Sequence, residues 1–244
     1  MQSPCPLPET TMSALEVVLA DTPDLLHQVY RFRYHVYVEQ MKRRQIHADH
    51  AARLIAEPMD ASARNYIAFK GGDAVGVIRA NMADDPAISY YRKIYKIDEL
   101  GLRDLSRIQI TTKLMVRPDL RRTAIGPRLI QHYADQGYQL GVEVDFLDCN
   151  KPLVPFFERM GYCSYRGWVF HKEYGTVRPM IYATDVIDYV DAIGSILAAP
   201  AKAHIMDDCY RGYDLIRRVA EPPASSHAHA AFVMAFKMRL RKSA

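Results

Sequence analysis

Three arginines lie in the short segment that joins a predicted strand to a predicted helix: Arg117, Arg121 and Arg122. Two small residues, Ala124 and Gly126, follow them, so an anion can approach the backbone closely there. A helix begins with unpaired N–H groups and the positive end of its dipole, and both attract anions. A pyrophosphate or a phosphodiester fits this turn, and a solvated basic turn that only caps a helix explains it equally well. The Walker phosphate loop and the dinucleotide-binding glycine fingerprint are both absent here.

The strand before this turn carries polar side chains at alternate positions, which is unusual for a strand of the core. They are Arg107, Gln109, Thr111 and Lys113. Side chains two apart along a strand point to the same side of a sheet, so we expect these four to share one face. The pattern predicts that this face lines a reaction channel.

Composition narrows the function classes. The chain has 244 residues, of which 49% are hydrophobic and 25% charged, as in an ordinary globular protein. A net charge of +4 is too small for a dedicated nucleic-acid binder but suits an anionic ligand or an acidic partner. The four cysteines are widely spaced without CxxC, so we expect reduced thiols and no metal site. The sequence shows no signal peptide and no transmembrane segment, so a cytoplasmic location is expected.

The elements can be placed from hydrophobic spacing and turn residues. A strand at 15–20, a helix opened by Thr22 and Pro23, and a hairpin around Gly71-Gly72 come first. The polar strand, a helix to about residue 140, a strand, a helix ending at Gly161 and two more strands follow. This order predicts an α+β fold with three layers (α/β/α) built on one mixed sheet.

Three regions follow from this reading. Residues 1–12 form a disordered lead-in, 13–183 the core domain, and 184–244 a helical extension. Within the extension, Met206, Tyr210, Tyr213 and Ile216 mark a helix. Apolar residues alternate with basic ones over 234–241, which predicts a final edge strand that could pair across a homodimer.

The segment "VRPDLRRTAIGPRLI" resembles the acyl-donor loop of the GNAT acyltransferase superfamily, R/Q-x-x-G-x-G/A, with Arg121 first, Ala124 in place of a glycine, and Gly126 last. "LDCNKPLVPFFERMGY" resembles the family's next block, in which Asn150 opens a helix. The resemblance spans roughly 15–182 and implies a GNAT-like mixed sheet flanked by helices. It also implies that an acyl-CoA, or the acyl-phosphopantetheine of an acyl carrier protein, binds as co-substrate at Leu114, Met115, Val116, Arg117, Arg121, Arg122, Thr123, Ala124, Ile125, Gly126 and Asn150.

Four further motifs resemble acyl-homoserine-lactone synthases and the related N-acyl amino acid synthases. "VYRFRYHVYVEQM" matches their first helix, with Arg33 in the place of that motif's arginine. Asp60 matches an acidic position, "GVIRA" carries Arg79, and "DLSRIQI" carries Asp104 and Arg107. Met41-Lys42 stands where the lactone synthases usually have Gly-Trp, which favours plain amide formation over lactone synthesis.

The resemblance implies aminolysis of an acyl thioester, which needs a bound donor, a placed amine, a proton acceptor and a stabilised oxyanion. Asp104 is the expected general base, with Arg107 beside it, and Asp60 is expected to recognise the amine. Expected substrate contacts are Arg33, Glu39, Arg79, Ser106 and Gln109. Buried arginines are costly unless paired, so Arg33, Arg79 and Arg107 with Asp60 and Asp104 form either a charged site or purely structural ion pairs. Phe157 occupies the position where many family members have the tyrosine that protonates the leaving thiolate, so Tyr162 or water would have to replace it.

The predicted function is transfer of a medium or long acyl chain to an amine, without a metal. The acceptor would be an amino acid, or a lysine- or ornithine-like side chain on a ribosomal natural-product peptide. Two alternatives stay open: a homoserine-lactone-type signal synthase, and a non-catalytic module that binds acyl-CoA. The basic loop suits either an acidic carrier protein or an acidic leader peptide as partner.

Overall fold

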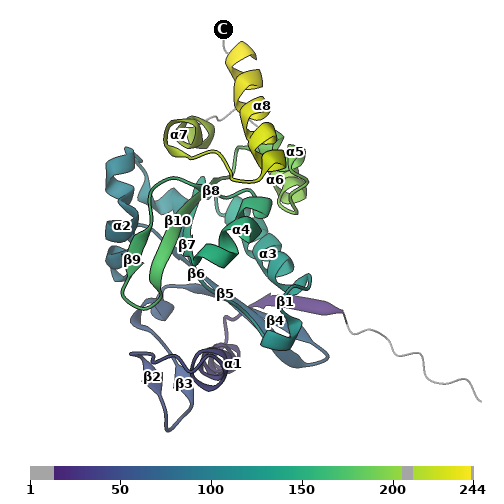
Figure 1. Ribbon diagram of the computed structural model, residues 1–244. Coiled ribbons are helices and arrows are strands. Elements are labelled where there is room, and N and C mark those ends of the chain that lie inside the picture. Colours follow the sequence, from purple (N-terminus) through teal and green to yellow (C-terminus); the bar gives the residue numbers. More distant parts are fainter. Residues whose placement is uncertain (1–13, 205–210, 243–244) are drawn as a thin grey trace, which may run out of the picture.

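The computed structural model describes residues 14–204 and 211–242. One sheet runs through the molecule in the order β1-β4-β5-β6-β7-β10-β8, with β9 paired to β10 (Figure 1). Strands β6 and β7 are parallel and their neighbours pair antiparallel, so the sheet is mixed, as predicted. The strands are β1 (Leu15–Leu19), β4 (Arg64–Lys70), β5 (Asp73–Met82), β6 (Ile108–Val116), β7 (Val144–Cys149), β8 (Cys163–Ser164), β9 (Val169–His171) and β10 (Gly175–Ala183), and a separate small hairpin contains β2 (Ala48–Asp49) and β3 (Leu54–Ile55).

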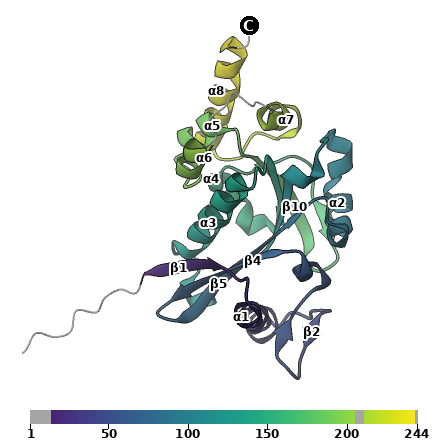
Figure 2. The same cartoon turned by 180° about the vertical axis from the view of Figure 1, so that it is seen from behind.

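Helices cover both faces of the sheet (Figures 1 and 2). They are α1 (Pro23–Tyr34), continued by a π-helical segment (His35–Gln40), α2 (Ser89–Tyr95), α3 (Ile125–Gln139) and α4 (Val154–Met160), with short 3-10 helices at Pro58–Ala61, Pro86–Ile88, Ile97–Leu100, Leu105–Arg107, Pro118–Leu120 and Lys151–Leu153. Phe146 of β7 stacks on Tyr95 of α2, whereas its neighbour Asp145 accepts a hydrogen bond from Tyr133 of α3. Adjacent strand residues point to opposite faces, so α2 and α3 lie on opposite sides of the sheet. The three-layer prediction is confirmed.

Local sequence signals for helix and strand ends also hold. Thr22 caps α1 by accepting a hydrogen bond from the N–H of Leu25 at 3.3 Å, and Pro23 follows at the first helical position. Gly161 ends α4 with φ of 107°, a left-handed conformation that favours glycine. A Cβ at Gly161 would lie 2.7 Å from Val190, so the helix end and the extension pack closely there.

The extension contains α5 (Ile187–Ala192), α6 (Ala198–His204), α7 (Arg211–Val219) and α8 (Ser226–Lys242), gathered beyond one end of the sheet (Figure 1). The predicted final edge strand is wrong, because residues 234–241 belong to helix α8. Its buried residues Ala228, Ala231, Phe232 and Ala235 recur at helical spacing, and this alanine-rich stripe outweighs the alternation further on. The basis for a dimer through that strand is therefore lost. The lead-in 1–12 and the helix positions Met206 and Tyr210 lie outside the described residues.

A bulge interrupts β6 next to β5. Arg79 of β5 pairs with Thr112 and Val77 pairs with Met115, so Lys113 and Leu114 together lie opposite Ile78. Lys113 has φ of 55°, which is uncommon for a residue with a side chain and marks local strain. One extra residue also reverses which face the following side chains point to.

Candidate active site

The main candidate site is a cavity of about 770 Å³ between strands β6 and β7. The two strands pair over Ile108–Ile110 and Val144–Phe146, and the cavity begins beyond this paired section. Its walls also come from the π-helical segment after α1, from the loop before α3, and from α4. The apolar part of the wall contains Val36, Met41, Leu147, Phe156, Phe157 and Met160. A site that lies between parted parallel strands can admit an extended ligand arm from one end to the other.

The donor loop forms one part of the cavity wall, with Arg121, Arg122, Thr123 and Gly126. Four more of the predicted donor residues also line the cavity: Leu114, Met115 and Val116 at the end of β6, and Asn150 after β7. Arg122 is exposed, has φ of 65°, and has no acidic partner among the described residues. Helix α3 starts three residues further on, at Ile125. The arrangement is suited to phosphate groups.

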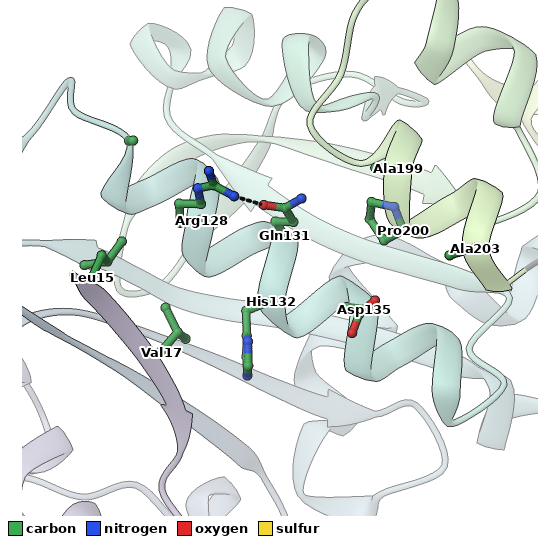
Figure 3. Close-up of a pocket in the computed structure, with 10 residues that line it drawn as sticks. Leu15, Val17, Arg128, Gln131, His132, Asp135, Ala199, Pro200 and Ala203 are labelled. Atoms are coloured by element: carbon green, nitrogen blue, oxygen red, sulfur yellow. Dashed lines mark hydrogen bonds between the residues drawn. The ribbon is translucent and has the colours of Figure 1, made fainter.

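Three other predicted donor residues do not line the cavity. Arg117 is paired with Asp119 at 2.9 Å and with Asp73 at 3.6 Å. Ile125 is buried in the core. Ala124 borders a second cavity of about 750 Å³ on the outer side of α3, where β1 and α6 face the helix residues Arg128, Gln131, His132 and Asp135 (Figure 3).

Buried charges form a continuous chain from the cavity wall into the core. The Lys113 Nζ atom lies 2.6 Å from Glu57 Oε1, and Arg79 Nη1 lies 2.8 Å from Glu57 Oε2. Arg79 Nη1 also donates to Asp60 at 3.1 Å, and Arg33 Nη1 donates to both oxygens of Asp60 at 2.7 and 2.9 Å. The structure thus brings Arg33, Asp60 and Arg79 together, as the motifs predicted, and adds Glu57 and Lys113.

Charge compensation decides the protonation of this chain. Burial raises the pKa of Asp60, but the charges of Arg33 and Arg79 and the N–H of Glu57 outweigh it, so the pKa lies below its ordinary value. The same balance, with Lys113 and Arg79, holds the pKa of Glu57 below its ordinary value. Both carboxylates are therefore ionised at neutral pH. The roles in substrate recognition stay predictions, because of this group only Lys113 lines the cavity.

Asp148 is the carboxylate that lines the cavity. It lies two residues beyond Phe146, and Thr112 lies two beyond its β6 partner Ile110, so Asp148 faces the bulge across the gap. Its Oδ2 atom is buried without a hydrogen-bond partner among the described residues. Burial raises the pKa of Asp148 to about 6; the Tyr95 side chain opposes this rise in part, and the nearby Glu173 charge adds to it. A carboxylate with a pKa near neutrality can accept a proton from a bound reactant.

The predicted general base lies elsewhere. Asp104 is on the surface at the start of β6, where it accepts hydrogen bonds from the Ser106 N–H at 3.0 Å and from the Ser106 hydroxyl at 2.6 Å. These bonds lower its pKa. Arg107 extends to Glu143 at 2.5 Å, with half of its side chain exposed. Asp104, Ser106 and Arg107 are therefore not part of the cavity wall, and the catalytic and substrate roles assigned to them stay predictions.

Two more predicted substrate contacts are also away from the cavity. Gln109 accepts a hydrogen bond from Arg64 at 2.5 Å and is close to Gly137 of α3. Glu39 is on the surface and pairs with His35 at 2.7 Å and with Arg53. The expected common face of Arg107, Gln109, Thr111 and Lys113 is wrong. Thr111 donates to Asp145 on the α3 side, whereas the bulge turns Lys113 to Glu57 on the other.

Neither position 157 nor Tyr162 offers an acid for a leaving thiolate. Phe157 lines the cavity, and the hydroxyl of Tyr162 donates to Asp145 at 2.5 Å inside the core. Tyr162 is therefore occupied away from the cavity. Sequence reasoning missed Glu57 and Asp148 and put Lys113 on the wrong face; the one available signal for the missed residues was a carboxylate, Asp148, at the end of a buried strand.

A family assignment follows from comparison with known proteins. The model of the acetyltransferase (GNAT) family matches residues 26–162, more than half of the chain. The chain belongs to the GNAT family. Enzymes of this family use acyl-CoA thioesters, which agrees with a cationic end and an elongated cavity. No curated protein matches this GNAT chain in sequence.

Solved structures agree with the GNAT fold. BjaI, a CoA-dependent acyl-homoserine lactone synthase solved with SAM and isopentyl-CoA, is 16% identical with a TM-score of 0.56, and the match covers 78% of this chain and 99% of BjaI. FeeM, an N-acyl amino acid synthase from uncultured soil microbes, is 11% identical with a TM-score of 0.54 and coverage of 77% and 98%. The AHL synthase LasI is 12% identical with a TM-score of 0.57 and coverage of 80% and 98%. At these identities the likeness concerns the fold.

None of the helices within 14–204 and 211–242 is long and apolar enough to span a bilayer. The same part of the chain contains no group of three or more metal-ligating side chains. The two cysteines it includes, Cys149 and Cys163, are buried free thiols whose pKa is raised to about 12 by burial, so they are poor nucleophiles.

Proposed function

We propose that this GNAT protein is an N-acyltransferase that moves a medium or long acyl chain from an acyl thioester to an amine. One observation supports it most: a single cavity has arginines in the donor loop and a carboxylate, Asp148, across from the β6 bulge, whose Oδ2 has no hydrogen-bond partner among the described residues. Phosphates would bind at the donor loop, and a cationic amine at Asp148. The apolar wall between α4 and the π-helical segment would hold the acyl chain.

In the proposed reaction, the amine nitrogen attacks the thioester carbonyl carbon. Asp148 takes one proton from the amine, directly or through a water, so that the nitrogen lone pair is free. The backbone N–H groups at the Lys113–Leu114 bulge would stabilise the tetrahedral oxyanion. The C–N bond forms, the C–S bond breaks, and the second proton of the attacking nitrogen passes through water to the leaving thiolate. A thiolate is a good leaving group, so the lack of a tyrosine at position 157 is tolerable.

The donor would be acyl-CoA or an acylated carrier protein, and the acceptor an amino acid or a lysine- or ornithine-like side chain, including one on a natural-product peptide. The test is mass spectrometry of purified protein mixed with acyl thioesters of 2 to about 16 carbons and a panel of amines, with S-adenosylmethionine included. Amide products support the proposal. Lactone formed from S-adenosylmethionine would instead identify a signal synthase, and thioester binding without any product a non-catalytic module.

Reversal of one charge at the donor end tests where the phosphates bind. Arg122→Glu is expected to raise the Kd for acyl-CoA about 10- to 100-fold, because it replaces a charge-assisted contact with repulsion. Isothermal titration at low and physiological salt measures this. Arg128→Glu is the matched control, since Arg128 lies six residues further on, in α3, and faces the second cavity (Figure 3). Equal losses for both variants would argue against a specific phosphate site at Arg122.

Asp104 provides a test between two candidate bases. Asp104→Asn is expected to keep kcat within about twofold, because the side chain is on the surface and its role there is to cap a 3-10 turn. Steady-state rates with the best thioester and amine decide it. A loss of about 100-fold or more at unchanged stability would return the base role to Asp104.

A further inference from the structure

The end of the cavity at Lys113 and Asp148, which we call the inner end, offers a carboxylate partner to a bound cation. Its own positive charges are already paired, so it offers little attraction to a bound anion. Lys113 lines the cavity there, Arg79 and Arg33 lie buried behind it, and each of the three cations lies within 3.1 Å of a carboxylate oxygen. Lys113 has two such partners, Glu57 at 2.6 Å and Glu173 at 2.9 Å. Asp60, Glu57 and Glu173 thus neutralise the three cations. Asp148 then remains as the acid with an unpartnered oxygen among the described residues that line the cavity.

His171 does not change this balance. Its Nδ1 atom accepts the N–H groups of Glu173 at 3.1 Å and Tyr174 at 3.2 Å, so the ring proton sits on Nε2. Burial lowers the pKa of His171 to about 4, which leaves the ring neutral at physiological pH. The histidine packs face to face on Tyr174, with ring centroids 4.4 Å apart. It therefore adds no positive charge for an acceptor carboxylate.

Aromatic rings complete this end of the cavity. Tyr37, Tyr91 and Tyr174 line it, and the Lys113 ammonium already lies over two of them, 5.0 Å from the Tyr37 centroid and 5.3 Å from the Tyr174 centroid. Tyrosine rings accommodate both an alkyl stem and an ammonium group. A carboxylate bonded to the carbon next to the nitrogen would instead lie close to Asp148 and Glu173, where like charges repel.

We propose that the acceptor is a primary amine on an alkyl stem, such as a lysine or ornithine side chain or an aliphatic diamine, and not the α-amino group of a free amino acid. This inference rests on the proposed N-acyltransferase function and specifies its acceptor. The ammonium pairs with Asp148 and the methylene groups pack among the tyrosines. After proton transfer to Asp148, the neutral nitrogen attacks the thioester as described above.

Two acetylated derivatives of lysine test the class of acceptor. Nα-acetyl-lysine amide presents only the side-chain amine, and Nε-acetyl-lysine presents only the α-amine with its carboxylate. With one acyl-CoA and the full-length protein, kcat/KM for the first is expected to exceed that for the second by at least about tenfold. Pentylamine, which has no carboxylate, should behave like the first. Asp148→Asn should lower all these rates, whereas Asp84→Asn, an exposed carboxylate outside the cavity, should not.

The opposite preference would overturn the inference while leaving the proposed function intact. If Nε-acetyl-lysine is the better substrate, the residue that reads its carboxylate should be Arg43, which lines the cavity without an acidic partner among the described residues. Arg43→Ala would then reduce kcat/KM for Nε-acetyl-lysine selectively. If none of the three amines is acylated, both the inference and the N-acyltransferase proposal fail together.

Discussion

Asp148→Asn is expected to lower kcat by about 10² to 10⁴-fold, the range typical for loss of a general base. An asparagine keeps the size and polarity of the side chain but cannot accept the proton of the amine. The donor end is untouched, since Arg121, Arg122 and Gly126 line the other part of the cavity. The Kd for acyl-CoA should therefore stay within about twofold while single-turnover amide formation collapses.

The pH profile provides a second readout of the same residue. Because the base works when ionised, kcat/KM in the wild type should fall as pH drops through about 6, the raised pKa of Asp148. In Asp148→Asn the residual kcat/KM should not show this fall at low pH. The charged and titratable groups that act on Asp148 are Glu173 and Tyr95, and neither is replaced in this variant. A fall that persists unchanged would assign the ionisation to another group.

Asp148→Asn should increase the stability of the fold although it lowers activity. Burial makes the folded protein hold the Asp148 proton more tightly than the unfolded chain does, whose pKa is near the ordinary 3.8. The free energy of unfolding therefore falls as pH rises from about 3.8 through about 6, by on the order of 2–3 kcal/mol. Asp148→Asn removes that penalty, so at pH 7.5 its Tm should equal or exceed that of the wild type. Loss of activity with gain of stability is a combination that misfolding cannot produce.

Asp145→Asn is the matched control. Asp145 lies on the same strand, is fully buried, and also has a pKa raised to about 6 by burial. Its oxygens accept hydrogen bonds from Thr111, Tyr133 and Tyr162 in the core, and it does not line the cavity. We expect its substitution to cost stability and to leave kcat of the folded fraction nearly unchanged. Equal kinetic losses in both variants would show that β7 geometry, not the base, was disturbed.

Most of the fold could be predicted from short-range sequence signals. Thr22 and Pro23 fix the start of α1, Gly161 fixes the end of α4, and the basic segment 117–126 contains its own strand-to-helix turn. Each of these depends on residues within about four positions, which a sequence displays directly. The pairing of Arg33, Asp60 and Arg79 was also foreseen, because buried guanidinium groups require partners.

The positions of the proposed catalytic side chains depend on information that a strand pattern lacks. Strict alternation places Lys113 with Gln109, but the two-to-one register against Ile78 turns Lys113 to the opposite face. Asp148 looks like any carboxylate at the end of a strand; its pKa is raised because of what packs around it. Asp104 carries a matching motif, yet its position at the paired start of β6 keeps it away from the point where the strands part. The helical stripe of α8 was overlooked because the alternation of its last residues was more conspicuous.

Asp60→Ala is expected to destabilise the fold by about 3–5 kcal/mol, the typical effect of removing one partner from a buried ion pair. The substitution leaves Arg33 without its carboxylate and deprives Arg79 of one of two, while both guanidinium groups are fully buried. The Asp60 carboxylate also accepts the N–H of Glu57 at 2.7 Å, so the 3-10 turn at Pro58–Ala61 loses its cap. Urea unfolding at pH 7.5 measures the loss.

Two further variants show how much of the stability lost in Asp60→Ala is due to burial of the ion pair. Glu39→Ala breaks the surface pairs with Arg53 and His35 and should cost below about 1 kcal/mol. Arg33→Met combined with Asp60→Leu removes both charges and should recover part of the loss, since Arg79 still pairs with Glu57. The pKa of Asp60 is held below its ordinary value, so its contribution is present above pH 3.8 and is lost as pH falls through the lower, folded-state pKa. If the double variant folds stably and still acylates amines, the ion pair between Arg33 and Asp60 has a purely structural role. If it folds but is inactive with a raised KM for the amine alone, those charges contribute to acceptor binding through Glu57 and Lys113.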